Sequence, residues 1–181
     1  MITETDLAYL AGFIDGEGCF FIGMFWCKTK SGNKNLNYHT YIKITNTDHA
    51  VMEWIKDTFN GTNYGQWRST DRARKHEKKI SHIQFTGKTL DEILPKLLPY
   101  LKVKKRQAEI MIKMRSTFIY GKRLSKHPDK KDIHDFRYQC MVELRKLNSR
   151  FHSHPLKQPY ALAPCCPSAK QLGGSSPLEK V

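Results

Sequence analysis

The sequence predicts an α+β domain built on an antiparallel four-stranded sheet with helices on one face. Two β-rich hairpin patterns alternate with amphipathic helical patterns, which gives the order αββαββα followed by two further helices. Helices in these positions can cover only one face of the sheet, because each hairpin is followed by a helix that packs back onto it. The other face is therefore expected to be free for a ligand.

The helices are predicted from apolar residues that recur at helical spacing. In the first, over residues 5–15, Thr5 or Asp6 is the expected cap, and the glycines of residues 16–18 are expected to end the helix. Its apolar stripe consists of Leu7, Leu10, Ala11 and Ile14. The other helices are predicted at residues 49–59, 88–98, 102–119 and 129–149.

The strands are predicted from β-forming and alternating residues. The aromatic run at 19–28 is typical of a largely buried strand, and residues 38–45 are its expected hairpin partner. The second hairpin is predicted to pair strands near 62–69 and 79–86. Residues 1–150 are expected to form a single domain, and residues 151–181 a flexible tail rich in Pro, Gly and Ser.

The charge of the chain indicates a polyanionic partner. It has 31 Lys and Arg against 17 Asp and Glu, a net charge of +14, which favours nucleic acid first and an anionic membrane second. A merely solubilising surface is the alternative. The hydrophobic fraction of 39% excludes a fully disordered chain, and no apolar stretch is long enough to span a membrane. Five cysteines without a CxxC pair, and no secretion signal, predict reduced thiols inside a cell.

The segment LAGFIDGEG at residues 10–18 ends a helix with two acids, Asp15 and Glu17. Carboxylates are unfavourable there, because the carbonyl end of a helix is already negative. A cation against this end would explain them, and carboxylate and backbone carbonyl oxygens are ligands that Mg²⁺ prefers. An ordinary glycine cap with incidental acids explains the pattern equally well, and the residues alone leave both open.

This segment resembles the signature helix of the LAGLIDADG homing endonucleases, with Phe13, Gly16 and Glu17 as departures from the motif. The basic segment at 98–108 also resembles the stretch before that family's next helix. The resemblance covers about residues 7–120 and is strongest with the single-motif type found in chloroplast introns. It implies the family's αββαββα fold, a saddle-shaped sheet on double-stranded DNA, and a homodimer that uses Mg²⁺ to cut both strands. It also implies an organelle, chloroplast or mitochondrion, as the location.

The resemblance also assigns roles to individual residues. Glu17 and the Gly16 carbonyl are the expected metal ligands, Lys104 the basic residue at the scissile phosphate, and Asn46 a polar residue that organises water. Lys104 could instead belong to a merely solvated helix start. The expected dimer contacts are Ala8, Ala11, Gly12 and Asp15, where Asp15 is a second candidate metal ligand or a brace for the neighbouring chain.

DNA contacts are expected from alternate residues of the strands, since neighbouring side chains point to opposite faces. Arg and Gln are suited to base edges and Lys to phosphates. The core side of the second strand is expected to hold Tyr38, Ile42 and Ile44. The candidate contacts are His39, Tyr41, Lys43, Gln66, Arg68, Arg72, Arg74 and Ser81, with Lys28, Lys30 and Lys34 on phosphates. A shift of one residue in the second hairpin would exchange its set of faces.

The function predicted from these features is site-specific, metal-dependent cleavage of double-stranded DNA at a long pseudo-palindromic site, with no small-molecule substrate. Two alternatives remain on the same fold: an RNA-binding intron maturase and a DNA-binding protein that does not cleave. Glu17 and Lys104 favour cleavage, because both kinds of residue that the reaction needs are present.

Overall fold

The computed structural model describes residues 2–28, 32, 34–67, 79–118 and 127–148. Within them the elements follow the predicted order. These are α1 (Glu4–Glu17), β1 (Gly18–Lys28), β2 (Lys34–Asn46), α2 (His49–Phe59), β3 (Thr62–Trp67), β4 (Ile80–Thr86), α3 (Gly87–Leu97), α4 (Lys105–Arg115) and α5 (Lys130–Asn148). The predicted tail, 151–181, lies outside the described residues.

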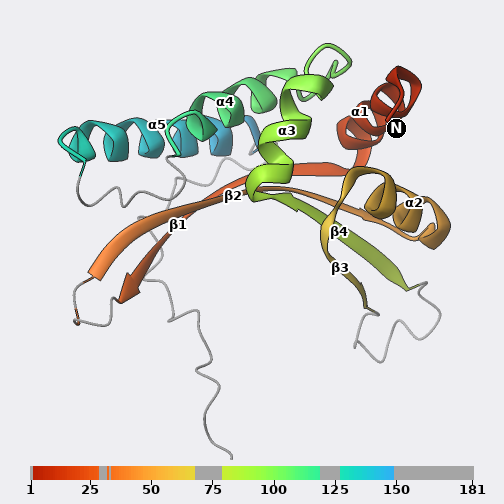
Figure 1. The fold of residues 1–181 in the computed structure, drawn as a ribbon, viewed down its shortest axis with the longest axis horizontal. Helices are drawn as coiled ribbons and strands as arrows, with labels where there is room; N and C mark the ends of the chain where they lie inside the picture. Colours follow the sequence, from red (N-terminus) through yellow and green to blue (C-terminus); the bar gives the residue numbers. More distant parts are fainter. Residues whose placement is uncertain (1, 29–31, 33, 68–78, 119–126, 149–181) are drawn as a thin grey trace, which may run out of the picture.

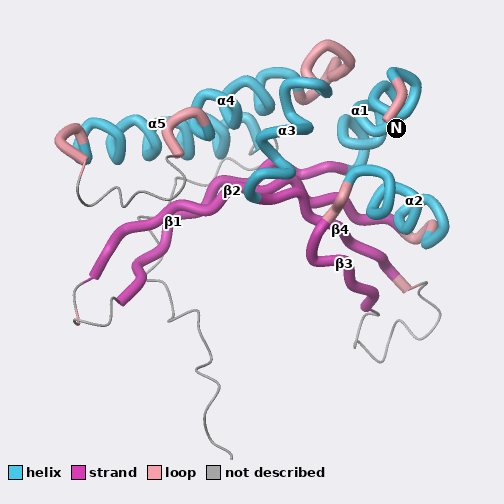
Figure 2. Tube along the Cα trace, viewed as in Figure 1, coloured by secondary structure: helices cyan, strands magenta, loops and turns pink. Residues whose placement is uncertain are grey.

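The four strands form one antiparallel sheet in the order β1-β2-β4-β3. All five described helices lie on the same side of this sheet, and the opposite, concave face is covered by no described element (Figures 1 and 2). This arrangement confirms the predicted fold class. None of the described helices combines the length and the apolarity that crossing a membrane would require.

The core lies between the helices and the inner face of the sheet. Leu10, Ala11 and Ile14 of α1 are fully buried, as their spacing predicts. They belong to one cluster with apolar residues of β2, β4 and the later helices, chiefly Ile42, Ile44, Met52, Ile55, Ile83, Phe85, Leu90, Leu94 and Met111. Burial of this cluster is the main force that holds the helices on one face.

Helix α1 is longer than its sequence pattern predicts at both ends. Its cap is Thr3 and not Thr5: the Thr3 hydroxyl accepts the Asp6 N–H at 3.2 Å, and the Asp6 carboxylate accepts the Thr3 N–H at 2.9 Å. This reciprocal capping box satisfies two backbone donors at once. At the other end the helix continues through Gly16 and ends at Glu17. The acids therefore lie within its last turn.

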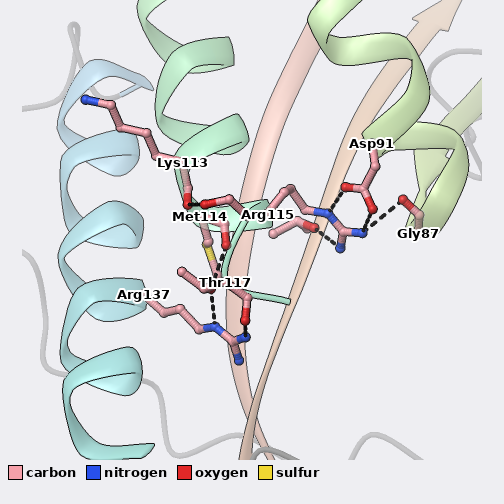
Figure 3. Close-up of polar contacts among 9 residues, drawn as sticks. Gly87, Asp91, Lys113, Met114, Arg115, Thr117 and Arg137 are labelled. Atoms are coloured by element: carbon pink, nitrogen blue, oxygen red, sulfur yellow. Dashed lines mark hydrogen bonds and ion pairs between the residues drawn. The ribbon is translucent and has the colours of Figure 1, made fainter. Parts of the chain in front are cut away.

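A buried arginine at the end of α4 fastens that helix to α3 and to the sheet (Figure 3). The Arg115 side chain is 8% exposed and binds Asp91 in a fork, with Nε–Oδ1 at 2.5 Å and Nη2–Oδ2 at 2.7 Å. It also donates to the Thr40 hydroxyl at 3.1 Å and to the Gly87 carbonyl at 3.0 Å. Gly87 begins α3 at φ +56°, a conformation that favours glycine.

Helix α5 is held by a second buried arginine and by contacts along β1 and β2. Arg137 donates to the Thr117 hydroxyl at 2.8 Å and to the Thr117 carbonyl at 2.6 Å (Figure 3). The Phe118 ring lies 4.2 Å from the Arg137 guanidinium carbon and 4.5 Å from that of Arg115. At the end of α5, the Asn148 amide donates to the Phe20 carbonyl at 2.9 Å. These contacts position α5 over the sheet.

Candidate active site and nucleic-acid interface

The C-terminal end of α1 meets the segment that leads into α4. The Asp15 carboxylate accepts three consecutive backbone N–H groups, from Lys102 at 2.7 Å, Val103 at 3.1 Å and Lys104 at 2.8 Å. Such N–H groups at a helix start have no partner within the helix, and a carboxylate is favourable against them. Asp15 thereby fixes where α4 begins, and the predicted start at residue 102 is wrong by three residues.

The Lys104 side chain returns to the same helix end. Its Nζ donates to the carbonyl oxygens of Ile14 at 2.9 Å and Asp15 at 2.7 Å. Burial lowers the pKa of the Lys104 ammonium below its ordinary value, while nearby acidic groups, Asp15 first among them, oppose that shift. The acidic helix end therefore does have a cation against it, and that cation is a lysine of the same chain.

Glu17 is the last residue of α1 and its side chain is exposed. Its carboxylate makes no hydrogen bond or ion pair in the part of the chain that the structure describes. No three His, Cys, Asp or Glu side chains gather at a metal-sized site within these residues. Mg²⁺ commonly takes one or two carboxylates and completes its shell with water and substrate phosphate oxygens. Glu17 and the adjacent backbone carbonyls fit such a partial site, whereas both Asp15 oxygens are already engaged.

Asn46 ends β2, and its side chain has a structural partner. Its Oδ1 accepts the Asp48 N–H at 2.8 Å, and the Asp48 carboxylate in turn accepts the Val51 N–H at 3.1 Å as the cap of α2. Asn46 therefore shapes the turn from the sheet into α2. Its role in organising water beside a metal stays a prediction. The amide NH₂ group would have to play that role, because Oδ1 is bound to Asp48.

On β2 the predicted alternation is correct. Tyr38, Thr40, Ile42 and Ile44 are buried on the helix side, and the intervening residues, which alternate with these four, face the open side of the sheet. Those intervening residues include His39, Tyr41 and Lys43. At the far end of the hairpin, Lys28 and Lys34 lie directly opposite each other and are exposed. Like charges in that register repel, which an anion between them would relieve.

On the second hairpin the predicted alternation is wrong by one residue. Ser81 is fully buried on the helix side, with its hydroxyl 2.6 Å from His49 Nδ1. Gln66 lies directly opposite Ser81, so it shares that face. The open face of β4 instead carries His82 and Gln84, opposite Thr45 and Lys43 of β2. A register shift between Thr62 and Gly65 interrupts the alternation of β3, and local sequence did not reveal it. Arg68, Arg72, Arg74 and Lys30 lie outside the described residues.

The strand β1 also differs from its prediction, because only half of it is buried. Phe20 and Ile22 point into the core, but Phe21 and Phe25 lie on the open face beside β2. Neither was among the predicted contacts, because the aromatic run resembles one largely buried strand. Their even spacing of four residues indicates that both lie on the same face of the strand, opposite to Phe20 and Ile22.

The exposed line of α1 differs from the predicted dimer seam. Ala11 is fully buried in the core and is not available to a neighbour, whereas Asp15 is partly exposed and its carboxylate binds the backbone of its own chain. Ala8, Gly12 and Gly16 are exposed and spaced four residues apart, which places them along one line of the helix. A Cβ atom added at Gly12 or Gly16 would meet nothing within 4 Å. Gly16 was missed as a member of this line, although its i+4 spacing indicates it.

Comparisons with known proteins show the family and the fold of the chain. The family model described as LAGLIDADG endonuclease matches residues 10–114, more than half of the chain. The chain belongs to the LAGLIDADG endonuclease family. The matched span begins with the signature residues of α1 and ends within α4, so it includes Glu17, the whole sheet and Lys104. A comparison with curated protein sequences gives no match.

Solved structures of LAGLIDADG homing endonucleases share the fold. The homing endonuclease I-CvuI, solved with its target in the presence of calcium, has 19% identity and a TM-score of 0.58, over 80% of this chain and 82% of that one. The archaeal intron-encoded I-Vdi141I, complexed with DNA, has 18% identity and a TM-score of 0.57, over 81% and 94% of the two chains. I-SmaMI, bound to uncleaved DNA with calcium, has 18% identity and a TM-score of 0.51, and the likeness spans 47% of its chain.

Proposed function

We propose that this LAGLIDADG family member is a site-specific, Mg²⁺-dependent DNA endonuclease of the homing type that acts as a homodimer. The observation that carries the proposal is the end of α1. An exposed carboxylate, Glu17, stands there beside a fixed ammonium group, Lys104. Both lie where α1 passes directly into β1, the edge strand of a sheet with an uncovered face.

Glu17 and Lys104 would have different roles in phosphodiester hydrolysis. Glu17 would hold the metal, with oxygen from water and phosphate completing the shell. The chemistry supplied there by a bound Mg²⁺ is charge stabilisation on the phosphate and a water of lowered pKa. Lys104 uses two of its three N–H donors on α1 carbonyls, so its position is fixed and the third can meet a phosphate oxygen.

The open face of the sheet would bind the DNA duplex. It carries neutral donors and acceptors beside Lys43. Lys28 and Lys34, exposed at the end of the first hairpin, follow the alternation of the helix side and not that of the open face. The net charge of +14 supports an affinity for a polyanion, and that affinity should fall steeply with salt. Side chains in alternate strand positions are suited to base edges in the major groove.

Two copies of the chain are proposed because one chain offers one catalytic end for two DNA strands. Glycine inside a helix costs about 1 kcal/mol relative to alanine. Neither Gly12 nor Gly16 is required by a contact within the described residues, because a side chain there would meet open space. A second α1 packed against this line would need both glycines. A two-fold dimer of this kind reads a pseudo-palindromic site.

Cleavage and binding are tested separately. Purified protein is used to select duplexes from a random DNA library in Ca²⁺, and the enriched duplexes are then incubated with Mg²⁺ or with EDTA. We expect double-strand cleavage in Mg²⁺ and none in EDTA. Glu17→Gln should bind the same duplexes and not cut them, whereas the control Glu4→Gln, at the exposed opposite end of the same helix, should cut normally.

The alternatives have distinct outcomes in the same experiment. Selective binding without cleavage under any divalent ion would indicate a DNA-binding protein that does not cleave. Enrichment of structured RNA and not of DNA, in a parallel RNA selection, would indicate a maturase. Normal cleavage by Glu17→Gln would remove the metal-ligand assignment and with it the proposed mechanism.

A further inference from the structure

Four rings form one cluster on the open face of the β1–β2 hairpin: Phe21, Phe25, His39 and Tyr41, here called the aromatic patch. Phe21 and Tyr41 lie directly opposite each other and stack, with ring centroids 4.6 Å apart and planes inclined by 16°. The His39 ring lies 5.5 Å from Phe21, 5.3 Å from Phe25 and 5.7 Å from Tyr41. His39 is therefore the centre of the patch.

A glycine makes this arrangement possible. Gly23 lies directly opposite His39, between Phe21 and Phe25 on the same strand. A Cβ atom at Gly23 would lie 2.5 Å from the Phe21 ring and 2.7 Å from His39 Nε2. The rings thus occupy the space that a side chain at position 23 would fill, so the patch is a packed unit and not four independent side chains.

The patch is uncharged, although the chain as a whole carries a net charge of +14. Burial lowers the pKa of His39 below its ordinary value of 6.5 and so favours the neutral imidazole, and burial raises the pKa of Tyr41 and so favours the neutral phenol. Neutral rings are poor phosphate ligands, since phosphate contacts come chiefly from Lys and Arg. On a strongly basic chain, an apolar area on the open face of the β1–β2 hairpin indicates contact with something other than the DNA backbone.

The geometry of the rings indicates which apolar group of a nucleic acid they can contact. Phe21 and Tyr41 are stacked face to face, so an unpaired base cannot insert between them. In the major groove of a duplex the one apolar group is the C5-methyl of thymine, and phenylalanine is among the residues that contact it. The packed patch therefore suits thymine methyl groups better than unpaired bases.

We propose that the aromatic patch is a specificity determinant that contacts thymine methyl groups in the major groove, so that the target carries thymine under the β1–β2 hairpin. This inference rests on the proposed binding of duplex DNA by the open face. It adds Phe21 and Phe25 to the candidate contacts, with His39 and Tyr41 acting as part of the same apolar surface.

The test replaces thymine with deoxyuridine, which removes the methyl group and changes nothing else in the base pair. Duplexes selected from a random library in Ca²⁺ are scanned with single replacements at every thymine. Wild-type protein should lose affinity about fourfold per contacted methyl group, the effect expected for one buried carbon. This scan does not depend on any variant being folded.

Two variants assign the effect to the patch. Phe21→Ser/Tyr41→Ser removes both rings and leaves no methyl group that could contact thymine, and its thermal unfolding is compared with the wild type. It should bind thymine and deoxyuridine duplexes equally at the affected positions. The control Tyr138→Ala removes an exposed aromatic ring from α5, on the helix side, and should keep the wild-type preference for thymine.

Each outcome separates the inference from the proposed function. Enrichment of duplexes with no deoxyuridine penalty, or a penalty that the double variant retains, would overturn the thymine contact and leave the endonuclease proposal standing. Tighter binding to single strands than to the selected duplex would also overturn it, in favour of base stacking. Failure to enrich any duplex would overturn the proposed function itself, and the inference with it.

Discussion

Asp15 and Lys104 bind each other twice. The Asp15 carboxylate accepts the Lys104 backbone N–H at 2.8 Å, and the Lys104 ammonium donates to the Asp15 backbone carbonyl at 2.7 Å. The negative end of α1 thus receives a cation and the positive start of α4 receives an anion, each from the other segment. This exchange holds the candidate catalytic lysine at the helix end that carries Glu17.

Asp15→Asn should destabilise the protein. An amide can replace part of the carboxylate's acceptors but brings N–H donors toward backbone N–H groups, and hydrogen bonds to a charged group are worth about 1.5–3 kcal/mol each. We expect the free energy of unfolding, measured by urea titration, to fall by about 2 kcal/mol. Asp57→Asn, at a carboxylate that is 71% exposed, is the control and should change it little. Equal effects of the two variants would contradict the anchoring role.

Lys104→Met should lower cleavage while DNA binding in Ca²⁺ is retained. Methionine keeps the length of the side chain but removes the donor, and loss of one such donor costs about 10²–10³ in rate. Lys102→Met, at an exposed neighbour whose backbone N–H also binds Asp15, is the control and should cleave normally. Wild-type cleavage by Lys104→Met would reduce the ammonium to a structural cap of α1.

Gly12→Leu should weaken the dimer without destabilising the fold of the single chain. The added side chain meets open space among the described residues, and leucine is a much better helix former than glycine, which costs about 0.8–1 kcal/mol relative to alanine, so the isolated subunit should become more stable. In a close helix seam the same group would force two backbones apart, and it would do so twice in a two-fold dimer. Sedimentation without DNA should show a wild-type dimer and a variant monomer. A wild type that is monomeric and still cuts both strands would contradict the two-chain architecture.

Acid should destabilise the fold through its histidines. Burial lowers the pKa of His39, His82 and His134 below the ordinary value of 6.5. Between the lowered values and 6.5 the unfolded chain binds more protons, so stability rises with pH and is lost as the pH falls through this window. The melting temperature should therefore be lower at about pH 5 than at about pH 7.5. His39→Phe should reduce that difference, and an unchanged difference would exclude His39 as a contributor.

Ending the chain after Arg150 should leave a folded protein that cleaves DNA. The residues beyond it lack the periodic apolar pattern of the helices and strands. The shortened chain should keep the thermal transition and the sedimentation coefficient of a dimer. Loss of either would show that the last 31 residues are part of the domain.

Much of the fold could be predicted because local periodicity reports which side of an element is apolar. Helix α2, over His49–Phe59, matches its predicted bounds, since Asp48 caps its start and Asn60, at φ +53°, ends it. The start of α4 could not be predicted in this way. Its preceding N–H groups are bound by Asp15, which lies 87 to 89 positions earlier in the chain. No pattern within a helix shows a partner at that separation.

The sequence by itself determined the order of elements, the family motif, the alternation along β2 and the acidic end of α1, because each depends on residues close together in the chain. Tertiary structure alone decided three further features. Lys104 is the cation at that end, the Asp15 carboxylate binds the backbone before α4, and the pairing of β3 with β4 shifts between Thr62 and Gly65. Each of these depends on contacts between segments that are far apart in the chain. The residue pattern of either segment alone does not show which distant segment will pack against it.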